Sequence, residues 1–391
     1  MSIFIPWLIF RLLTSLYAAW ISALRPLTPL EQIVPLLPPS LPLSSWLERV
    51  ALSPWLRWDA VWYQRIVDHG YDPANGTAQF HPLYPWLAKV VAIPGTHPLL
   101  ALLLVSSLSS LGFLYIYHRL AQVELSGENA RFSLLLILLA PTAFIFFAPY
   151  PEALFLLCAA SSFLFAHNLR WWLAGMAAGL ATLTRQQGIF LFFPLAYMLW
   201  EAYGSSWDKL KHQWVKFLSL SLIPISYAAW IIYRSAVLGD LSLKLSSLQS
   251  LIYSLFISPS ATEVVPQQSF VWPWQAIGHA IQKVAYQPDA DIWVNIILAV
   301  IFLLLLCISW KRMRPAFRLY SVIIFLISFS YYTGPIHPYM GLPRHLLLAF
   351  PVFIYASPRL NKAILRPAYL TLMGSLYLFQ IYLYVMEAWI P

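Results

Sequence analysis

The chain has 391 residues, of which 60% are hydrophobic and only 10% are charged. A typical soluble domain carries roughly 25% charged residues, so this composition excludes a soluble globular fold. The formal net charge is +9, but the basic residues stand in short clusters between apolar segments. That pattern is typical of the cytoplasmic loops of membrane proteins, and it argues against nucleic acid as a partner.

Apolar segments long enough to cross a bilayer, which takes ~20 residues as a helix, recur along the whole chain. They are continuous rather than alternating, which predicts helices and not barrel strands. We therefore expect an all-α polytopic membrane protein, with residues 1–391 forming a single integral membrane domain. About eleven membrane helices are predicted, at residues 3–24, 98–118, 131–148, 151–168, 171–184, 187–202, 214–235, 292–310, 316–332, 345–357 and 366–387.

A cytoplasmic N-terminus would place the basic short loops and helix ends, such as 311–314, on the cytoplasmic side. The long connections 25–97 and 236–291 then become two large external loops. Chemistry is therefore expected on the external side. Within the first loop, the amphipathic stretch 44–55 predicts a short helix lying in the membrane interface.

The densest polar cluster of the chain follows, at residues 57–71. If residues 59–67 are helical, Asp59, Trp62 and Tyr63 share one face, so that an acid stands beside aromatic rings. Such a face suits a sugar. An equally open alternative is that Asp59 only caps the N-terminus of an interfacial helix.

The proline-aromatic segment 79–85 predicts a rigid turn rather than a regular helix. Its His81 could be a base, a phosphate contact or an interfacial histidine. Three further polar insertions interrupt apolar sequence, at 149–152, 184–188 and 337–345. Charges in membrane segments are costly, which makes such insertions candidates for function.

The expected topology brings Asp59, Glu152, Arg185 and Arg344 to the same external face. Arginine forks suit a phosphate, and an external enzyme cannot rely on cytosolic nucleotide sugars, which favours a lipid-phosphate sugar as donor. No sequence motif for ATP, dinucleotide or zinc binding is present. Asp59 with Asp68 could hold a divalent ion, but two carboxylates alone do not define a metal site.

At these positions the sequence resembles the PIG-V family of mannosyltransferases, which includes the second mannosyltransferase of glycosylphosphatidylinositol assembly. The resemblance rests on five segments in the same order: Arg57 to Tyr63 with His69 to Tyr71, Phe80 to Pro85, Ala148 to Phe155, Thr184 to Gly188, and Leu342 to Leu347. It implies a GT-C-type glycosyltransferase fold whose catalytic acid lies in the first external loop, matched here by Asp59.

The resemblance further implies that mannose is moved with inversion from dolichyl or another polyprenyl phosphate to a lipid-linked or glycan acceptor. Asp59 would deprotonate the acceptor hydroxyl, Arg185 and Arg344 would hold the leaving phosphate, and Glu152 would orient the acceptor or an arginine. No cofactor is implied. The expected substrate-binding residues are Arg57, Trp58, Trp62, Tyr63, His81, Glu152, Arg185, Gln186, His337, Arg344 and His345.

The sequence departs from the family pattern at His81, Ala153, Gln186 to Gln187 and His345, while its charged positions are kept. Short cytoplasmic loops favour a bacterial or archaeal plasma membrane over the endoplasmic reticulum. Two alternatives stay open: a transporter or flippase of a lipid-linked sugar, whose ionisable residues usually lie near the midplane, and a non-catalytic subunit of a membrane transferase.

Overall fold

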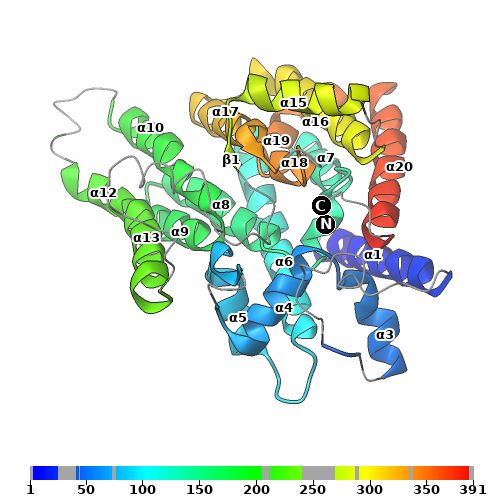
Figure 1. Cartoon of the computed structure of the whole chain (residues 1–391). Coiled ribbons are helices and arrows are strands. Elements are labelled where there is room, and N and C mark those ends of the chain that lie inside the picture. The colour runs from blue at the N-terminus through cyan, green and yellow to red at the C-terminus, as the bar shows by residue number, and fades with distance from the viewer. Residues whose placement is uncertain are drawn as a thin grey trace.

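The computed structural model describes residues 3–24, 41–43, 45–72, 76–204, 211, 213–239, 269–286, 290–333 and 338–386. Most of these residues belong to helices that pack side by side (Figure 1). The helices of ten or more residues are α1 (Phe4–Leu24), α4 (Asp59–His69), α6 (Pro98–Glu124), α7 (Gly127–Leu138), α8 (Glu152–His167), α9 (Trp171–Thr184), α10 (Phe192–Ala202), α13 (Leu222–Ile232), α15 (Pro273–Tyr286), α16 (Ala290–Trp310), α17 (Pro315–Ser330), α19 (Pro351–Leu360) and α20 (Leu365–Val385).

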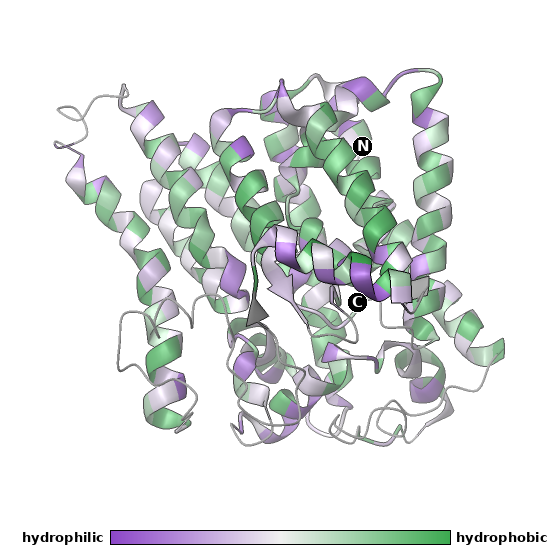
Figure 2. Ribbon diagram, turned by 45° about the horizontal axis from the view of Figure 1, so that its top comes forward, coloured by the Kyte–Doolittle hydropathy of each residue, from purple (hydrophilic) through white to green (hydrophobic). Residues whose placement is uncertain are grey.

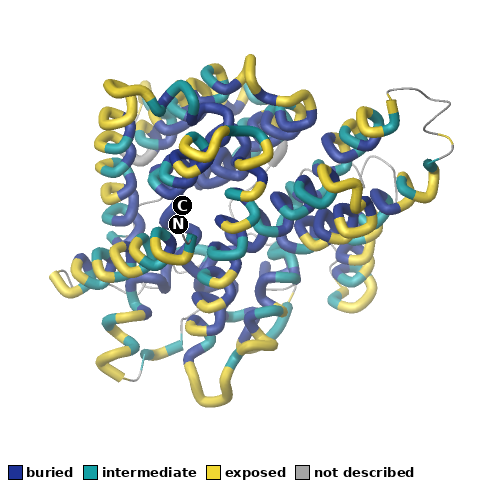
Figure 3. Tube along the Cα trace, turned by 180° about the vertical axis from the view of Figure 1, so that it is seen from behind, coloured by how far each residue is buried: buried dark blue, intermediate teal, exposed yellow. Residues whose placement is uncertain are grey.

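Five helical segments of the described chain are long and apolar enough to cross a membrane: Phe4–Leu24, Pro98–Glu124, Trp214–Val237, Ile292–Trp310 and Leu365–Val385. Their outward surfaces are exposed and apolar, as the hydropathy colouring of Figure 2 and the burial colouring of Figure 3 show together. Exposing so much apolar surface to water is unfavourable, whereas the hydrocarbon core of a bilayer accommodates it. The predicted all-α membrane class is therefore confirmed.

The predicted helices 3–24, 98–118, 151–168, 171–184, 292–310, 316–332 and 366–387 correspond to α1, α6, α8, α9, α16, α17 and α20. Two other predicted helices are wrong, because each is broken by a proline. The span 131–148 divides into α7 and the 3-10 helix η4 (Ala143–Phe146), with Pro141 between them. The span 345–357 divides into α18 (Leu342–Leu346) and α19, which begins at Pro351. Proline removes a backbone donor and clashes with the preceding turn, so it ends one helix or starts the next.

Two more predicted spans are helical but irregular. The span 187–202 begins as the 3-10 helix η5 (Gln186–Leu191) and continues as α10. The span 214–235 is built from α12 (Trp214–Leu218), the 3-10 helix η6 (Ser219–Ser221), α13 and a π-helical turn, η7 (Tyr233–Val237).

The described part of the first predicted external loop is also mostly helical. It holds α3 (Trp46–Leu52), η1 (Ser53–Trp55), α4 (Asp59–His69), η3 (Thr77–Gln79) and α5 (Leu83–Val91). The predicted helix in 44–55 is confirmed by α3, which Ser45 and Glu48 close with a capping box. The expectation of a turn without regular helix over 79–85 is wrong from Leu83 onward. Pro82 is the N-cap of α5 and Pro85 falls in its first turn, where a missing N–H removes no helical bond.

Much of the second predicted external loop lies outside the described residues. Its described part contains the two-residue strand β1 (Ser269–Phe270) and α15 (Pro273–Tyr286), which the sequence did not predict. β1 pairs antiparallel with β2 (Tyr331–Tyr332), which directly follows α17. This short pair is the one exception to the all-α class in the described chain.

Polar contacts tie the N-terminal helix into the bundle. The Trp7 indole N–H donates to Ser110 Oγ at 2.8 Å, and the hydroxyls of Thr14 and Tyr377 lie 2.6 Å apart. Buried polar groups in apolar surroundings need partners, so these bonds fix α1 against α6 and α20. The bundle thus joins segments from both ends of the chain.

Candidate active site

Asp59 is the first residue of α4, and Trp58 is the N-cap residue. The backbone of Trp58 has φ 51° and ψ −123°, which lies in the left-handed region that residues with side chains rarely adopt. Such a conformation costs ~1–3 kcal/mol and tends to occur at functional sites. The alternative that Asp59 only caps a helix is wrong, because Trp58 holds that position.

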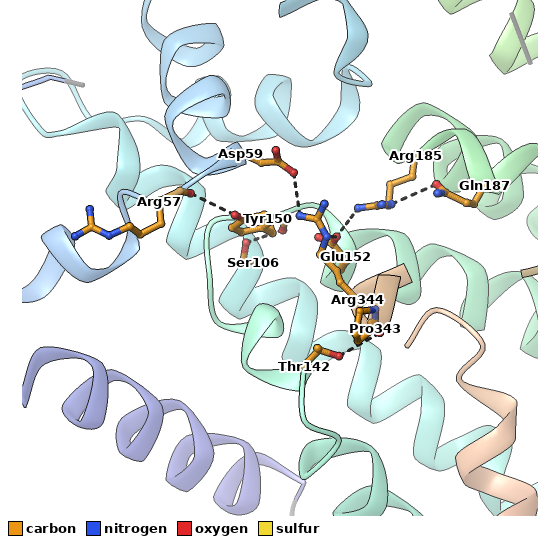
Figure 4. A network of polar contacts seen from close by, with 10 residues as sticks. All are labelled: Arg57, Asp59, Ser106, Thr142, Tyr150, Glu152, Arg185, Gln187, Pro343 and Arg344. Atoms are coloured by element: carbon orange, nitrogen blue, oxygen red, sulfur yellow. Dashed lines mark hydrogen bonds and ion pairs between the residues drawn. The ribbon is translucent and has the colours of Figure 1, made fainter. Parts of the chain in front are cut away.

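Four charged side chains form an ion-pair network, which Figure 4 shows: Asp59, Glu152, Arg185 and Arg344. Arg344 Nη1 donates to Asp59 Oδ2 at 2.9 Å, and Arg344 Nε lies 3.2 Å from Glu152 Oε1. Arg185 Nη1 donates to the same Glu152 oxygen. The structure thus brings together four residues that the sequence spreads over 286 positions, from 59 to 344.

The network is closed at one end and open at the other. The side chain of Glu152 is 0% exposed, those of Arg344 and Arg185 are 10% and 11% exposed, and that of Asp59 is 35% exposed. A fully buried carboxylate persists only when cations compensate it, and here two guanidinium groups do so. Its second oxygen, Oε2, has no hydrogen-bond partner among the described residues. Asp59 is therefore the member that a molecule arriving from outside reaches most easily.

Both acids of the network begin a helix. Asp59 opens α4, and Glu152 opens α8 directly after Pro151. The unpaired N–H groups of a helix N-terminus carry partial positive charge and stabilise a carboxylate there. The local sequence, an acid followed by a helix-forming segment, therefore places both Asp59 and Glu152 at a helix N-terminus.

Arg185 reaches Glu152 because the chain reverses tightly after α9. Arg185 itself is extended, with φ −153°, and the Gly188 N–H donates to its carbonyl at 2.9 Å. A Cβ on Gly188 would lie 2.3 Å from the Thr182 backbone nitrogen, so only glycine fits this close approach. Gln187 Oε1 accepts a bond from Arg185 Nε at 3.3 Å, a contact that the sequence did not suggest.

Arg344 is held from three sides. It lies in α18, whose N-cap is the left-handed Gly341, with φ 71°. Its guanidinium carbon stands 5.1 Å from the centroid of the Tyr150 ring, in the geometry of a cation–π contact. Burial alone would lower the pKa of Arg344, but the carboxylates of Glu152 and Asp59 raise it above its ordinary value. The guanidinium therefore stays charged.

Tyr150 connects the network to the rest of the fold. Its hydroxyl donates to the Arg57 carbonyl at 3.3 Å, and its own carbonyl accepts a bond from Ser106 in α6 at 3.1 Å. Tyr150 was not among the predicted site residues, although it stands in one of the polar insertions. The Arg57 guanidinium points away from Asp59 (Figure 4). It donates to the Val385 and Leu56 carbonyls. The structure does not bring it into the network.

The predicted sugar-facing aromatic residues of α4 are mostly packed. Trp62 and Tyr63 are buried and contact the ring of Phe80, with centroid distances of 6.0 and 5.0 Å. Tyr63 also meets Tyr84 edge-on. Burial and the nearby Asp59 carboxylate raise the pKa of the Tyr63 hydroxyl. These contacts show how α4 is held against α5 and give Asp59 a rigid support.

His81 belongs to a second group of side chains, the aromatic cluster, which consists of Tyr71, His81, Tyr227, Trp230 and Tyr233. Its Nδ1–H donates to the Thr182 carbonyl at 2.7 Å. Burial lowers the pKa of His81 to about 3, although the bond to Thr182 opposes the shift. His81 therefore holds the end of α9 as a neutral ring, rather than joining the network as a charge.

The other predicted site residues are placed as follows. His345 is buried beside Arg344, with its ring edge-on to Tyr331 at 5.4 Å. Gln186 is the first residue of η5, and His337 lies outside the described residues. Asp68 pairs with His69 at 3.0 Å. In the described ranges no group of three or more His, Cys, Asp or Glu side chains is placed to hold a metal ion.

No protein-family model matches the sequence, and no curated protein matches it either. The structure is similar to that of ArnT from Cupriavidus metallidurans in the apo state, with a TM-score of 0.49 and 14% identity over 86% of this chain and 71% of that chain. It is also similar to the archaeal oligosaccharyltransferase AglB from Archaeoglobus fulgidus, solved in complex with an inhibitory peptide and a dolichol-phosphate. There the TM-score is 0.40 and the identity 13%, over 96% of this chain and 55% of that chain.

A further structure, of an Archaeoglobus fulgidus oligosaccharyltransferase in complex with Zn and sulfate, gives a TM-score of 0.39 over 52% of its chain. This chain thus spans about half the length of the oligosaccharyltransferase chains that it matches. All three TM-scores lie below 0.5, so they establish neither a shared family nor a shared function. The resemblance to PIG-V mannosyltransferases stays a prediction from the sequence motifs.

Proposed function

We propose that this chain is an inverting glycosyltransferase with a GT-C-type fold, which moves mannose from a polyprenyl phosphate sugar to a lipid-linked or glycan acceptor. The observation that carries the proposal is the ion-pair network itself. Arg344 bridges Asp59 and Glu152, and Glu152 in turn pairs with Arg185, so one accessible carboxylate contacts one guanidinium group directly and is linked to a second through the buried Glu152. A transfer from a sugar phosphate needs this combination of a base and cations.

In the proposed reaction Asp59 accepts the proton of the acceptor hydroxyl while that oxygen attacks the anomeric carbon. The bond from this carbon to the phosphate oxygen breaks, and the electron pair leaves with the polyprenyl phosphate. Arg185 and Arg344 stabilise the charge that develops on this phosphate, since arginine forks match its oxygens. Attack opposite the leaving group inverts the anomeric centre.

Glu152 has a positioning role in this proposal. It is fully buried and contacts both arginines through one oxygen, so it sets their spacing and orientation before a substrate arrives. The Asp59–Arg344 contact is the exchangeable one, because Asp59 is its exposed partner. A donor phosphate that pairs with Arg344 would replace Asp59 there and leave that carboxylate ready to accept a proton.

The position of the network along α6 supports an external site. The network adjoins Ser106, eight residues after the start of α6, through Tyr150, whereas Glu124 at the end of α6 pairs with Arg314 at 3.0 Å. Ser106 and Glu124 are 18 residues apart, which is ~27 Å of helix and close to the thickness of a bilayer core. The Arg314 end carries the basic loops and is the cytoplasmic one by the positive-inside rule. The same placement near one surface favours an enzyme over a transporter with a midplane site.

The test is transfer of radiolabelled mannose from polyprenyl-phosphate mannose to native lipid extract by the purified protein. A labelled product from the wild type, absent with Asp59→Asn, is the expected result and identifies the acceptor. Equal inertness with several lipid-linked sugars would favour a transporter or a non-catalytic subunit. Equal activity would keep the transferase but remove Asp59 as its base.

A further inference from the structure

Helix α15 (Pro273–Tyr286) lies outside the network, and the proposed reaction gives it no role. It packs beside α17 and α16 (Figure 1), with Ala276 and Ala280 as its buried residues. The ring of His279 lies 5.2 Å from that of Tyr332 in β2. The helix is therefore fixed to the protein along one side.

Both ends of α15 stand on the same face of the bundle. Just before it, the Val271 N–H donates to the Ser330 carbonyl at the end of α17, at 3.0 Å. Just after it, α16 begins at Ala290. The short connection 311–314 joins α16 to α17, so these two helices run in opposite directions. The start of α16 and the end of α17 therefore lie at the same level of the bundle. A helix of 14 residues is ~21 Å long, too short to cross ~30 Å of hydrocarbon. α15 therefore lies along the surface.

The residues of α15 divide among three sides. Ala276 and Ala280 face the protein. Trp274, Ile277 and Ile281 follow one another at spacings of three and four, so they share a second side, which is exposed and apolar. Gln275, His279 and Gln282 share a third side, which is exposed and polar. Among the described residues, the packing against α16 and α17 thus leaves the apolar side exposed.

Trp272 enlarges this apolar side. Its ring stacks on that of Trp274, with centroids 5.1 Å apart and an interplanar angle of 4°. Both rings are exposed. The neighbouring helix α16, which is long and apolar enough to cross a membrane, also presents exposed Trp293 and Ile297 near its start.

We propose that α15 is a surface-lying membrane anchor, whose apolar side, formed by Trp272, Trp274, Ile277 and Ile281, is immersed in the lipid headgroup boundary on the side of Asp59. Lipid is the occupant that fits, because α15 packs beside α16, which is apolar enough to cross a membrane, and tryptophan rings favour this depth. A helix with one apolar and one polar side lies in this boundary rather than above it.

The anchor stands close to the proposed active site. β1 precedes α15 and pairs with β2, and the Tyr331 ring of β2 contacts His345, the neighbour of Arg344. If the proposed function holds, the headgroup level that α15 marks is where a lipid phosphate meets Arg344. The anchor itself does not depend on that function.

The test uses the full chain with Cys158→Ala and Cys307→Ser, and one added cysteine at either of two adjacent positions, Ile281→Cys or Gln282→Cys. Each variant carries an environment-sensitive nitrobenzoxadiazole label and is placed, one copy each, in phosphatidylcholine nanodiscs. The two quenchers are phosphatidylcholine with a doxyl group near its headgroup and aqueous iodide. We expect the doxyl lipid to quench the label at 281 several-fold more than that at 282, and iodide to show the opposite order.

Equal quenching of both labels by iodide would place the apolar side in water and overturn the anchor. Protection of position 281 from both quenchers would show that protein covers this side, which also overturns it. Neither measurement needs catalysis, so the result stands even if the chain transfers no sugar.

Discussion

The ion-pair network and the aromatic cluster hold the same turn of the chain by opposite means. Glu152 binds Arg185 through paired charges. Thr182, three residues before Arg185, is held instead by His81, which binds its carbonyl as a neutral ring among aromatic side chains. The network ends in the partly exposed Asp59, but the cluster buries Trp230 and Tyr227. Two segments of the first predicted external loop therefore differ in role: α4 supplies an accessible charge, and His81, just before α5, supports the end of α9.

The largest expected effect separates these tasks directly. Asp59→Asn should lower transfer by about 10²–10⁴-fold, the usual contribution of a general base. The matched control is Asp68→Asn, since Asp68 lies in the same helix and its side chain is likewise 35% exposed. The control should keep wild-type transfer. Comparable losses in both variants would mean that the reactive role does not belong to Asp59.

Removing the buried acid should destabilise the network rather than only slow the reaction. Glu152→Gln leaves two guanidinium groups without their carboxylate, and breaking a buried pair in this way costs about 3–5 kcal/mol. Thermal unfolding in detergent measures the loss. Glu128→Gln, at a side chain that is 72% exposed, is the control and should unfold like the wild type. An unchanged midpoint for Glu152→Gln would show that the arginines do not depend on it.

The turn that both regions hold should not accept a side chain at Gly188. In Gly188→Ala the new Cβ would meet the Thr182 backbone 2.3 Å away, and overpacking of this kind costs about 1–3 kcal/mol. Since the turn also positions Arg185, transfer should fall with stability. Gly278→Ala in α15 meets no atom within 4 Å and should be neutral or slightly stabilising. Equal midpoints for the two variants would contradict this account of the turn.

The smallest expected effect is the pH dependence of the cluster. The pKa of His81 is about 3 in the folded chain and about 6.5 when unfolded, so acidification protonates the unfolded state first. Folding stability should therefore fall as the pH drops below 6.5, by about 2 kcal/mol at pH 5. His81→Asn keeps a donor for the Thr182 carbonyl but cannot titrate. Between pH 7 and pH 5 its free energy of unfolding should therefore fall by about 2 kcal/mol less than that of the wild type.

The control for this prediction is His167→Asn, because His167 is exposed at the end of α8. Its acid sensitivity, followed by thermal unfolding at both pH values, should match that of the wild type. If His81→Asn also matched the wild type, the histidine would not be held neutral in the folded chain.

The amino-acid sequence by itself determined the membrane class and the four charges of the network. The length of an apolar segment and the cost of placing a charge in lipid are local properties of the chain, so both can be predicted without knowing how the helices pack. The same holds for the helix starts at Asp59 and Glu152. The breaks at Pro141 and Pro351 could also have been predicted, because proline acts on its own turn.

Only the tertiary structure decided which charges pair and which residues support them. Arg57 and Arg344 both carry guanidinium groups, yet only Arg344 meets Asp59, from 285 residues away. His81 pairs with a backbone carbonyl, which has no signature in the sequence, and α15 with its strand pair was likewise unpredicted. Periodicity and propensity describe neighbours along the chain, whereas a contact between distant segments depends on how whole helices pack, and that is set by all of their side chains together.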